Sequence, residues 1–424
     1  MTRHYLNNMF PPIALFGLVV LLMVLPITLA AEPLDDRSVR VGMLFEKQIV
    51  TMRVQAAEGD WQITLTPKPQ QFTRSKKKVD LSPEIIWLDN GEDITLQITA
   101  KGILGRLSGE KELDRGYSKI EFSEGALLSV EIPDQPVFVI SGKLEITTDS
   151  YDLIVTNELP MGEYLTSAVS DLTRVSEIEA IKAYLIMART RTAYLLDHKV
   201  HASASIDVCD TTHCFHFPGK ADDREIVSIL REQTANQVMR HKGKLFFCHF
   251  QNCCGGQISS GQDIFGVPDP VHKAMEDRVA GKGSENCFHD PSFLWRREFS
   301  KEEIRSFLSI AFAAGADNVY LRWAPVALDS TGRITKVLLS GSTTKNLTGT
   351  EFLNGAYSYF GENGIKSTRL TTQPMQRGFI YRGMGQGFGV GMCLRGADGL
   401  AKKGYNAQRI LQFYYSDISF STGN

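Results

Sequence analysis

The stretch "VTNELPMGEYLTSAVSDLTRVSEIEAIKAYLIMARTRTAYLL", Val155 to Leu196, holds the strongest helical signal of this 424-residue chain. It begins as a strand. After Pro160, which suits the first turn of a helix, apolar residues recur at helical spacing. A second helix is predicted from Ser176, because Ser176 and Glu179 have the S-x-x-E spacing of a capping box. The sequence thus predicts two helices that meet at a tight corner.

Asp171 lies at the end of the first of these helices and is the candidate acid of the corner. The negative end of a helix dipole and apolar neighbours both raise the pKa of a carboxyl group, and a carboxyl protonated near neutral pH can act as a general acid. The backbone amides at the start of the next helix would lower the pKa of Asp171 if they point at its carboxyl group. The alternative is a structural aspartate that caps the corner or pairs with Arg174 or Arg189.

The segments around the corner predict an α+β fold with mixed, largely antiparallel β structure. Short alternating runs from Arg40 to Val139 indicate an N-terminal all-β region. Beyond residue 200, strands and helices mix without a repeating βαβ rhythm. We expect an N-terminal β domain over 38–139 and a second domain, which carries the corner, over 140–422.

The N-terminus and the charge balance bear on the compartment. Arg3 and His4 precede an apolar run from Ile13 to Leu25, and small residues follow at Ala30 and Ala31. Residues 1–31 therefore predict a secretory signal or an uncleaved N-terminal anchor, and we expect an exported protein of the periplasm or cell envelope that touches a membrane only through that segment. The formal net charge of −2 gives no general attraction to nucleic acid, and no such partner is expected.

The loop "VHASASIDVCDTTHCFHFPG" carries four side chains of the kind that bind zinc, namely His201, Cys209, His213 and Cys214. Thiolate and imidazole are ligands of tetrahedral zinc. A disulfide between Cys209 and Cys214 is the equal alternative in an oxidising compartment. A second histidine-bearing segment contains His249, which either binds substrate or is a hydrogen-bonded structural residue.

Near the C-terminus the chain reads "YRGMGQGFGVGM", Tyr381 to Met392, with glycine at every second position from 383 to 391. The spacing excludes a G-x-G-x-x-G nucleotide loop, and no G-K-[ST] follows. Since alternate side chains of a strand share a face, we expect a strand with one bare face against which a ligand chain or a helix can lie.

Five ordered segments together resemble one family. The opening stretch, "CDTTHC", "HFQNCCGG", the glycine segment and the closing "ILQFYY" are similar to the stage II sporulation protein D family of peptidoglycan lytic transglycosylases and amidase enhancers. The similarity runs over most of the chain from about Arg40. In this reaction one carboxylic acid protonates the leaving oxygen of the MurNAc–GlcNAc bond and then takes the proton of the sugar's own 6-hydroxyl, so the chemistry requires no cofactor and no second carboxylate.

The resemblance implies the site residues. Asp171 stands in the position of the catalytic Glu of the family, and Phe388 stands in the position of a His. The implied partner is the glycan strand of peptidoglycan, in cell division or sporulation, and the glycine segment becomes the expected floor of its groove. The residues expected to contact glycan are Arg189, His249, Gly385, Gln386, Gly387, Phe388 and Gly389.

Two other hypotheses remain open at this point. The departures at Asp171 and Phe388 also suit a catalytically inactive peptidoglycan-binding protein or an enhancer of a cell-wall amidase. A zinc-dependent hydrolase is disfavoured, because the sequence has no H-E-x-x-H.

Overall fold

The computed structural model describes residues 33–422 except 46, 70–80, 109–111, 124, 150, 173–176, 212, 221–224, 281–282 and 314–318. The predicted signal or anchor at 1–31 lies outside the described residues. None of the helices in the described ranges is long and apolar enough to cross a membrane.

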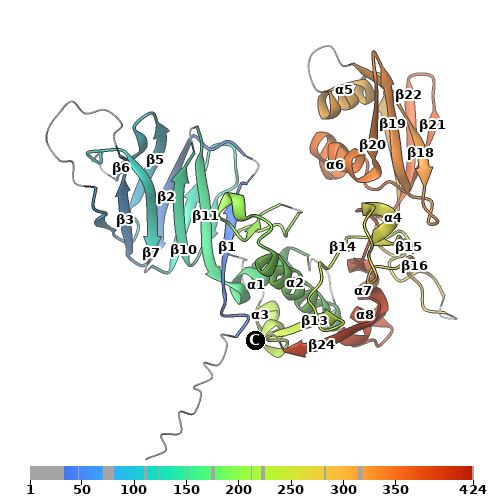
Figure 1. Ribbon diagram of the computed structural model, residues 1–424, viewed down its shortest axis with the longest axis horizontal. Coiled ribbons are helices and arrows are strands. Elements are labelled where there is room, and N and C mark those ends of the chain that lie inside the picture. Colours follow the sequence, from blue (N-terminus) through green and yellow to red (C-terminus); the bar gives the residue numbers. More distant parts are fainter. Residues whose placement is uncertain are drawn as a thin grey trace, which may run out of the picture. The chain divides into compact units, whose positions relative to one another are not determined.

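A twelve-stranded sheet occupies the first half of the described chain (Figure 1). Its main path runs β12-β1-β11-β10-β7-β6-β5-β2-β8-β9, and β3 pairs with β4 and β7. All neighbours are antiparallel except β1 and β12. The strands are β1 (Ser38–Met43), β2 (Thr51–Glu58), β3 (Trp61–Pro67), β4 (Glu84–Leu88), β5 (Asp93–Thr99), β6 (Gly102–Leu107), β7 (Tyr117–Ser123), β8 (Leu127–Glu131), β9 (Phe138–Ile140), β10 (Lys143–Thr148), β11 (Leu153–Pro160) and β12 (Val208–Cys209).

The alternating pattern of these strands explains the first hydrophobic core. In β3, for example, Trp61, Ile63 and Leu65 are fully buried while the residues between them are partly exposed. The sheet continues without a break across position 139, since β10 pairs with β7 and β11 pairs with both β10 and β1. The domain boundary expected between 139 and 140 therefore falls inside one sheet.

A second core surrounds α2 (Ile178–His198), which is buried along most of its length. It packs against four helices and against β13 (Gln237–His241), which pairs with β24 (Ile418–Thr422). These helices are α1 (Met161–Leu172), α3 (Glu225–Gln233), α7 (Leu394–Lys402) and α8 (Ala407–Tyr414). Short elements complete this part: η1 (Ala202–Ala204), β14 (Phe250–Gln251), β15 (Gln257–Ile258), α4 (Gly261–Phe265), β16 (Met275–Glu276) and β23 (Met392–Cys393).

A third core is formed by a segment inserted between β16 and β23. One of its sheets has the order β17-β22-β21 and the other has β18-β19-β20. The elements are β17 (Leu294–Ser300), α5 (Lys301–Phe312), β18 (Tyr320–Leu328), β19 (Ile334–Gly341), β20 (Thr344–Thr348), α6 (Gly349–Phe360), η2 (Gly361–Asn363), β21 (Leu370–Pro374) and β22 (Gly378–Met384). Capping boxes of Ser300 with Glu303 and of Thr348 with Glu351 start its two α-helices.

The predicted α+β class is confirmed, whereas the predicted start of the second helix is wrong in one detail. The N-cap of α2 is Glu177, and Ser176 lies outside the described residues. The carboxylate of Glu179 accepts the backbone N–H of Ala407 at 2.8 Å and contacts Lys182 at 3.0 Å. Glu179 therefore satisfies an N–H in the first turn of α8.

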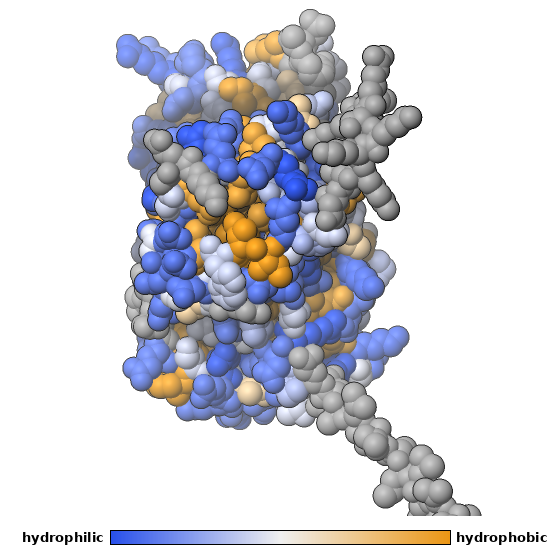
Figure 2. Space-filling view, turned by 90° about the vertical axis from the view of Figure 1, so that its left-hand side faces the viewer, coloured by the Kyte–Doolittle hydropathy of each residue, from blue (hydrophilic) through white to orange (hydrophobic). Residues whose placement is uncertain are grey.

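The face of the molecule shown in Figure 2 is mostly hydrophilic, with a small group of hydrophobic side chains near its centre. Exposed apolar side chains of the sheet include Ile85 and Trp87 of β4. Single exposed apolar groups are common on protein surfaces, so they carry no functional assignment here.

Candidate functional site

The corner between α1 and α2 is the centre of the candidate site. Asp171 belongs to the last turn of α1, as the sequence indicates. Its side chain, and residues 173–176 of the corner, lie outside what the structure describes. The ionisation and the contacts expected for the Asp171 carboxyl therefore stay predictions.

The N-terminus of α2 is already bound by a carboxylate from α7. Asp398 Oδ1 accepts the backbone N–H of Glu177 at 3.2 Å and the hydroxyl of Tyr184 at 3.3 Å. The same hydroxyl donates to the carbonyl of Leu394 at 2.7 Å. These contacts fix α7, which directly follows the glycine segment, against the α1–α2 corner. The structure thus links the region of the predicted acid to the segment predicted to hold glycan.

The glycine segment is not the strand that its alternation predicts. Strand β22 ends at Met384, and Gly385, Gly387, Gly389 and Gly391 have φ of 79°, 117°, 92° and 74°. This left-handed backbone favours glycine. A Cβ on Gly389 would lie 2.0 Å from Arg333 Nε, and one on Gly391 would lie 1.9 Å from the His249 carbonyl oxygen. The expectation of one bare face is wrong: protein groups occupy the space beside these glycines, and Gly385 and Gly389 are buried.

The side chains between the glycines differ in their surroundings. The Gln386 Oε1 accepts hydrogen bonds from Asn252 Nδ2 and Ser292 Oγ, each at 2.9 Å, and its backbone pairs with Cys253. Phe388 is half-buried and lines a shallow surface hollow with Ile264 and Thr368. The volume of this hollow that a water molecule could occupy is about 0 Å³, so it cannot enclose a saccharide.

His249 lies against aromatic rings and next to a second histidine. Its imidazole stacks on Phe265 at a centroid distance of 4.4 Å and meets the ring of His272 edge-on at 4.9 Å. Burial, together with the charge of Arg191, lowers the pKa of His249 to about 2. His249 is therefore neutral at physiological pH and can offer one donor and one acceptor.

The sequence did not single out the pair that supports His249. His272 Nδ1 and Asp269 Oδ2 lie 2.7 Å apart, and His272 Nε2 accepts the backbone N–H of His249 at 3.2 Å. Although burial opposes the shift, the hydrogen bonds that Asp269 accepts from the His272 side chain and from the backbone lower its pKa to about 2. The aspartate fixes the histidine tautomer, with Nδ1 as donor and Nε2 as acceptor.

Arg189 does not have the substrate-binding position expected for it. Its side chain is fully buried, and Nη2 lies 3.0 Å from Asp35 Oδ2 while Nε bonds the other carboxylate oxygen. Nη1 donates to the carbonyl of Gln237. With its donors used inside the protein, Arg189 is a structural residue that holds the start of the described chain to α2.

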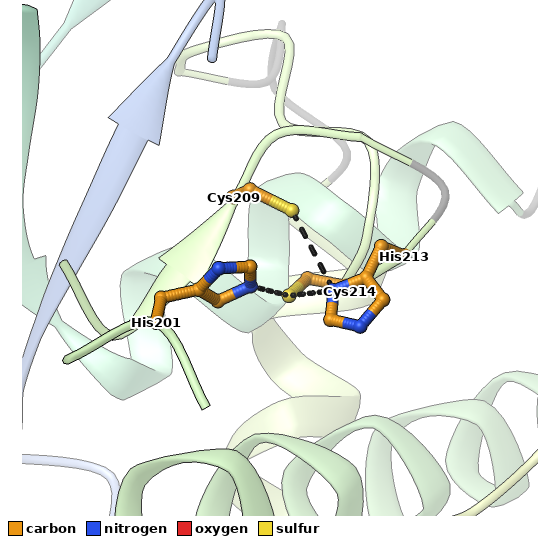
Figure 3. A group of neighbouring side chains, drawn as sticks. All are labelled: His201, Cys209, His213 and Cys214. Atoms are coloured by element: carbon orange, nitrogen blue, oxygen red, sulfur yellow. Dashed lines mark hydrogen bonds between the residues drawn. The ribbon is translucent and has the colours of Figure 1, made fainter. Parts of the chain in front are cut away.

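The four predicted metal ligands do come together (Figure 3). Their ligand atoms all lie within 4.8 Å of one another. His201 Nε2 is 3.3 Å from the Cys214 Sγ, and His213 Nδ1 is 3.5 Å from the same sulfur and 3.9 Å from the Cys209 Sγ. We call these four residues the His201 cluster. Two buried cysteines and two less buried histidines in this arrangement fit a tetrahedral Cys2His2 zinc site.

The thiols of the His201 cluster share their protons unequally. The hydrogen bond from Cys214 lowers the pKa of Cys209 to about 3, against the effect of burial. The same contact and burial raise the pKa of Cys214. Metal binding requires both cysteines as thiolates and therefore releases protons.

The loop that carries the His201 cluster packs against α1, the first helix of the α1–α2 corner. Cys209 ends β12, which pairs with β1 at Gly42. Further along the loop, the ring of Phe217 packs against Tyr164 of α1 at 5.7 Å, and Ser167 of α1 donates to the carbonyl of Gly219. These contacts of the loop therefore support α1, whose last turn contains Asp171.

A second group of thiols escaped sequence reasoning. The side chains of Cys254, Asp277, Cys287 and Cys393 meet in the interior. They are separated by 23, 10 and 106 positions along the chain, and no short motif reveals such a group. In the sequence, the one sign of this group is that all seven cysteines lie beyond residue 200.

Comparison with known proteins identifies part of the chain. Residues 149–241 match the family model SpoIID, stage II sporulation protein. This range holds β11, the α1–α2 corner, the His201 cluster, α3 and β13. An uncharacterised protein of Brachyspira hyodysenteriae is 25% identical over 269 residues, which cover 63% of this chain and 68% of the relative. The family match supports a cell-wall-related role. Residues 149–241 therefore match the stage II sporulation protein D family.

Proposed function

We propose that this protein is an exported lytic transglycosylase that cleaves the MurNAc–GlcNAc bonds of peptidoglycan, with Asp171 as its single acid and base. The observation that carries the proposal is the position of Asp171 in the last turn of α1, inside the family-matched range, next to a corner that α7 braces through Asp398. A carboxyl group on the last turn of a helix meets the negative end of the dipole, which favours the protonated acid.

The reaction needs one carboxyl group in two protonation states. The acid donates its proton to the glycosidic oxygen as the bond from C1 to that oxygen breaks. The resulting carboxylate then takes the proton of the 6-hydroxyl of the same MurNAc, whose oxygen bonds to C1 and closes a 1,6-anhydro ring. The proton returns to the carboxyl group, so the enzyme is regenerated without water as nucleophile.

Aromatic and neutral hydrogen-bonding groups around the glycine segment suit the sugar rings of a glycan. His249 is held neutral beside Phe265, and the ring of Phe388 lies 6.5 Å from that of Phe265. Carbohydrates bind to aromatic faces and neutral hydrogen-bonding groups, and these side chains offer both kinds of contact. Within the glycine segment we retain Gln386, Gly387 and Phe388, which are half-buried, as glycan contacts.

The test compares two carboxylates on one helix. Purified protein is incubated with peptide-stripped glycan strands, and the products are identified by mass spectrometry. We expect anhydro-disaccharide products from the wild type and from Glu163→Gln, whose carboxylate in the first turn of α1 accepts a hydrogen bond from Ser141. Asp171→Asn should lose at least about 100-fold in rate. Equal rates in the Asn variant and the wild type rule out the assigned role.

A catalytically inactive glycan-binding protein or amidase enhancer is the second candidate. Asp171 is one methylene shorter than the family Glu, and a misplacement of about 1 Å can cost on the order of 100-fold in rate. Phe388 also replaces a titratable His. Glycan binding without turnover, in both the wild type and Asp171→Glu, supports this candidate. Gain of turnover in Asp171→Glu would instead show that the groove is catalytically competent.

We also propose that the His201 cluster holds a structural zinc ion. The ion would supply four strong bonds that order the loop packed against α1. Cys209→Ser should abolish this zinc in metal analysis and make the loop more sensitive to protease. The alternative is a disulfide between Cys209 and Cys214. In that case the wild-type protein binds no zinc and its mass is lower by two hydrogens, and Cys209→Ser abolishes this mass loss.

A further inference from the structure

The second thiol group has the composition of a metal site. Cys254, Asp277, Cys287 and Cys393 have ligand atoms within 4.8 Å of one another, and all four residues are buried. The Cys254 Sγ lies 3.5 Å from the Cys287 Sγ and 3.0 Å from Asp277 Oδ2. Zinc–sulfur bonds of about 2.3 Å place the sulfurs of a tetrahedral site about 3.7 Å apart. The observed spacing therefore needs only small shifts to accept an ion.

The carboxylate of this group is oriented by neutral donors. Asp277 Oδ1 accepts from the Tyr414 hydroxyl and from Asn286 Nδ2, each at 2.9 Å, and this leaves Oδ2 directed at Cys254. Such outer contacts are typical of metal ligands. They do not neutralise the carboxylate, and a buried carboxylate among neutral groups is costly unless a cation accompanies it.

Backbone amides are aimed at two of the sulfurs. Cys393 is the N-cap residue of α7, and its Sγ accepts the N–H groups of Gly396 and Cys254, each at 3.2 Å. The Cys254 Sγ accepts the N–H of Gly256 at 3.3 Å. N–H groups directed at a sulfur are outer contacts of the kind that orient the thiolate ligands of a metal.

The glycine at position 396 leaves room for the carboxylate of Asp277. A Cβ at Gly396 would lie 2.4 Å from Asp277 Oδ2 and 2.2 Å from the hydroxyl of Tyr414. Because φ is not positive at this position, the glycine is required by the close approach of these side chains and not by its backbone conformation. Glycine at 396 thus permits the arrangement that presents Asp277 to the thiols.

We propose that Cys254, Cys287, Cys393 and Asp277 bind one zinc ion in a closed structural site. Four buried protein ligands leave no position for water or substrate, which distinguishes a structural from a catalytic zinc. The ligands come from the turn after β14, the residue after β16, the segment before β17 and the end of β23. The ion therefore ties together both ends of the inserted segment that forms the third core.

The test counts metal ions in matched cysteine variants. Protein purified with zinc under reducing conditions is weighed by native mass spectrometry and its zinc is quantified. With the His201 cluster also filled, the wild type is expected to hold two zinc ions per chain, and Cys287→Ser and Cys393→Ser one fewer. Cys248→Ser is the control, because Cys248 is equally buried but belongs to neither group. Cys248→Ser should keep both zinc ions.

The readout separates this site from the His201 cluster and from the glycan chemistry. Cys209→Ser should lose only the zinc of the His201 cluster, so one ion must remain. A chain that holds no zinc in the Cys209→Ser variant overturns the proposal, and this result does not depend on the folding of any Cys287 variant. A disulfide between Cys254 and Cys287 in the reduced preparation, seen as a mass loss of two hydrogens, overturns it as well.

Cobalt substitution tests which four residues bind. The thiol of Cys253 contacts those of Cys287 and Cys393, so it is the competing fourth ligand. The measurement is made in the Cys209→Ser background, which removes the thiolate site of the His201 cluster. There we expect thiolate-to-cobalt charge-transfer absorption and tetrahedral d–d bands that survive addition of Cys253→Ser and disappear on addition of Cys287→Ser. Loss of these bands in Cys253→Ser, with retention in Asp277→Asn, refutes the proposed ligand set.

Discussion

Single residues fix the corner from two sides. Arg189 of α2 is bound by Asp35, and the first amide of α2 is bound by Asp398 of α7. Removal of one member of a buried ion pair destabilises the folded protein, because water cannot solvate the charge that remains. The two aspartates therefore hold α2, and with it the corner that carries Asp171, by contacts from opposite ends of the chain.

The Arg189–Asp35 pair should be far more important for stability than a surface pair. Asp35→Asn leaves a guanidinium of 0% exposure without a countercharge, and we expect the free energy of unfolding to fall by about 3 kcal/mol or more. Asp197→Asn is the control, because its pair with Arg37 is 42% and 49% exposed and should cost less than about 1 kcal/mol. Urea denaturation measures both. Similar losses in the two variants would contradict a structural role for Arg189.

His249 should make the protein less stable in acid. Its pKa is about 2 in the folded protein and ~6.5 in an unfolded chain, so between these values the unfolded state binds the extra proton. The free energy of unfolding should therefore fall as pH decreases from 6.5, by roughly 2 kcal/mol between pH 7 and pH 5. His249→Gln lacks this titration. Denaturation curves across pH should be flatter for the variant, and parallel curves for both proteins refute the assignment.

Sequence reasoning predicted residues better where they are neighbours in the chain. The His201 cluster was found because its four ligands lie within 14 positions. Arg189 was assigned to substrate because nothing in the sequence shows that Asp35 reaches it across 154 positions. The partners of Asp277 and Cys393 are equally remote. Long-range contacts of this kind depend on the packing of the helices and cannot be derived from spacing.

Among the elements, the glycine segment shows how one pattern can serve two structures. Alternation with period two is the mark of a strand. Here it places glycine at four successive alternate positions with positive φ, so the chain winds closely past Gln251, Cys253 and Arg333. The helical corner was predictable because apolar residues repeated with a period of 3.6 residues indicate an α-helix. Glycine at alternate positions is compatible with several backbone conformations, and the sequence pattern alone does not distinguish between them.

Substitution of Gly389 should be much more harmful than substitution of Gly404. Both have positive φ, of 92° and 84°, but only Gly389 faces a fully buried side chain, that of Arg333. Gly389→Ala adds a clash to the backbone strain and should cost roughly 2–5 kcal/mol, against about 1 kcal/mol for Gly404→Ala. Thermal unfolding of the two variants measures the difference. Equal melting temperatures would show that Arg333 moves aside freely.

At the scale of the whole molecule, the two ends of the described chain meet in one core. Leu34, Val39 and Val41 are buried in the same cluster as α1, α2, α7 and α8. The class of the fold was predictable, since the alternating and helical patterns of the elements are local. The division at 139/140 rested on a change of local pattern, and such a change does not reveal which strands pair.

The sheet predicts that the second half of the chain does not fold without β1. A fragment of residues 140–424 lacks the strand that pairs with β11 from Ser38 to Met43 and with β12 at Val41 and Gly42. It also lacks Asp35, so Arg189 would be buried without its partner. We expect this fragment to show no cooperative thermal transition and rapid proteolysis. The fragment 33–424 forms one compact unit, keeps all of these contacts and should unfold cooperatively. If the shorter fragment unfolds with the same midpoint, β1 is dispensable and the second domain is autonomous.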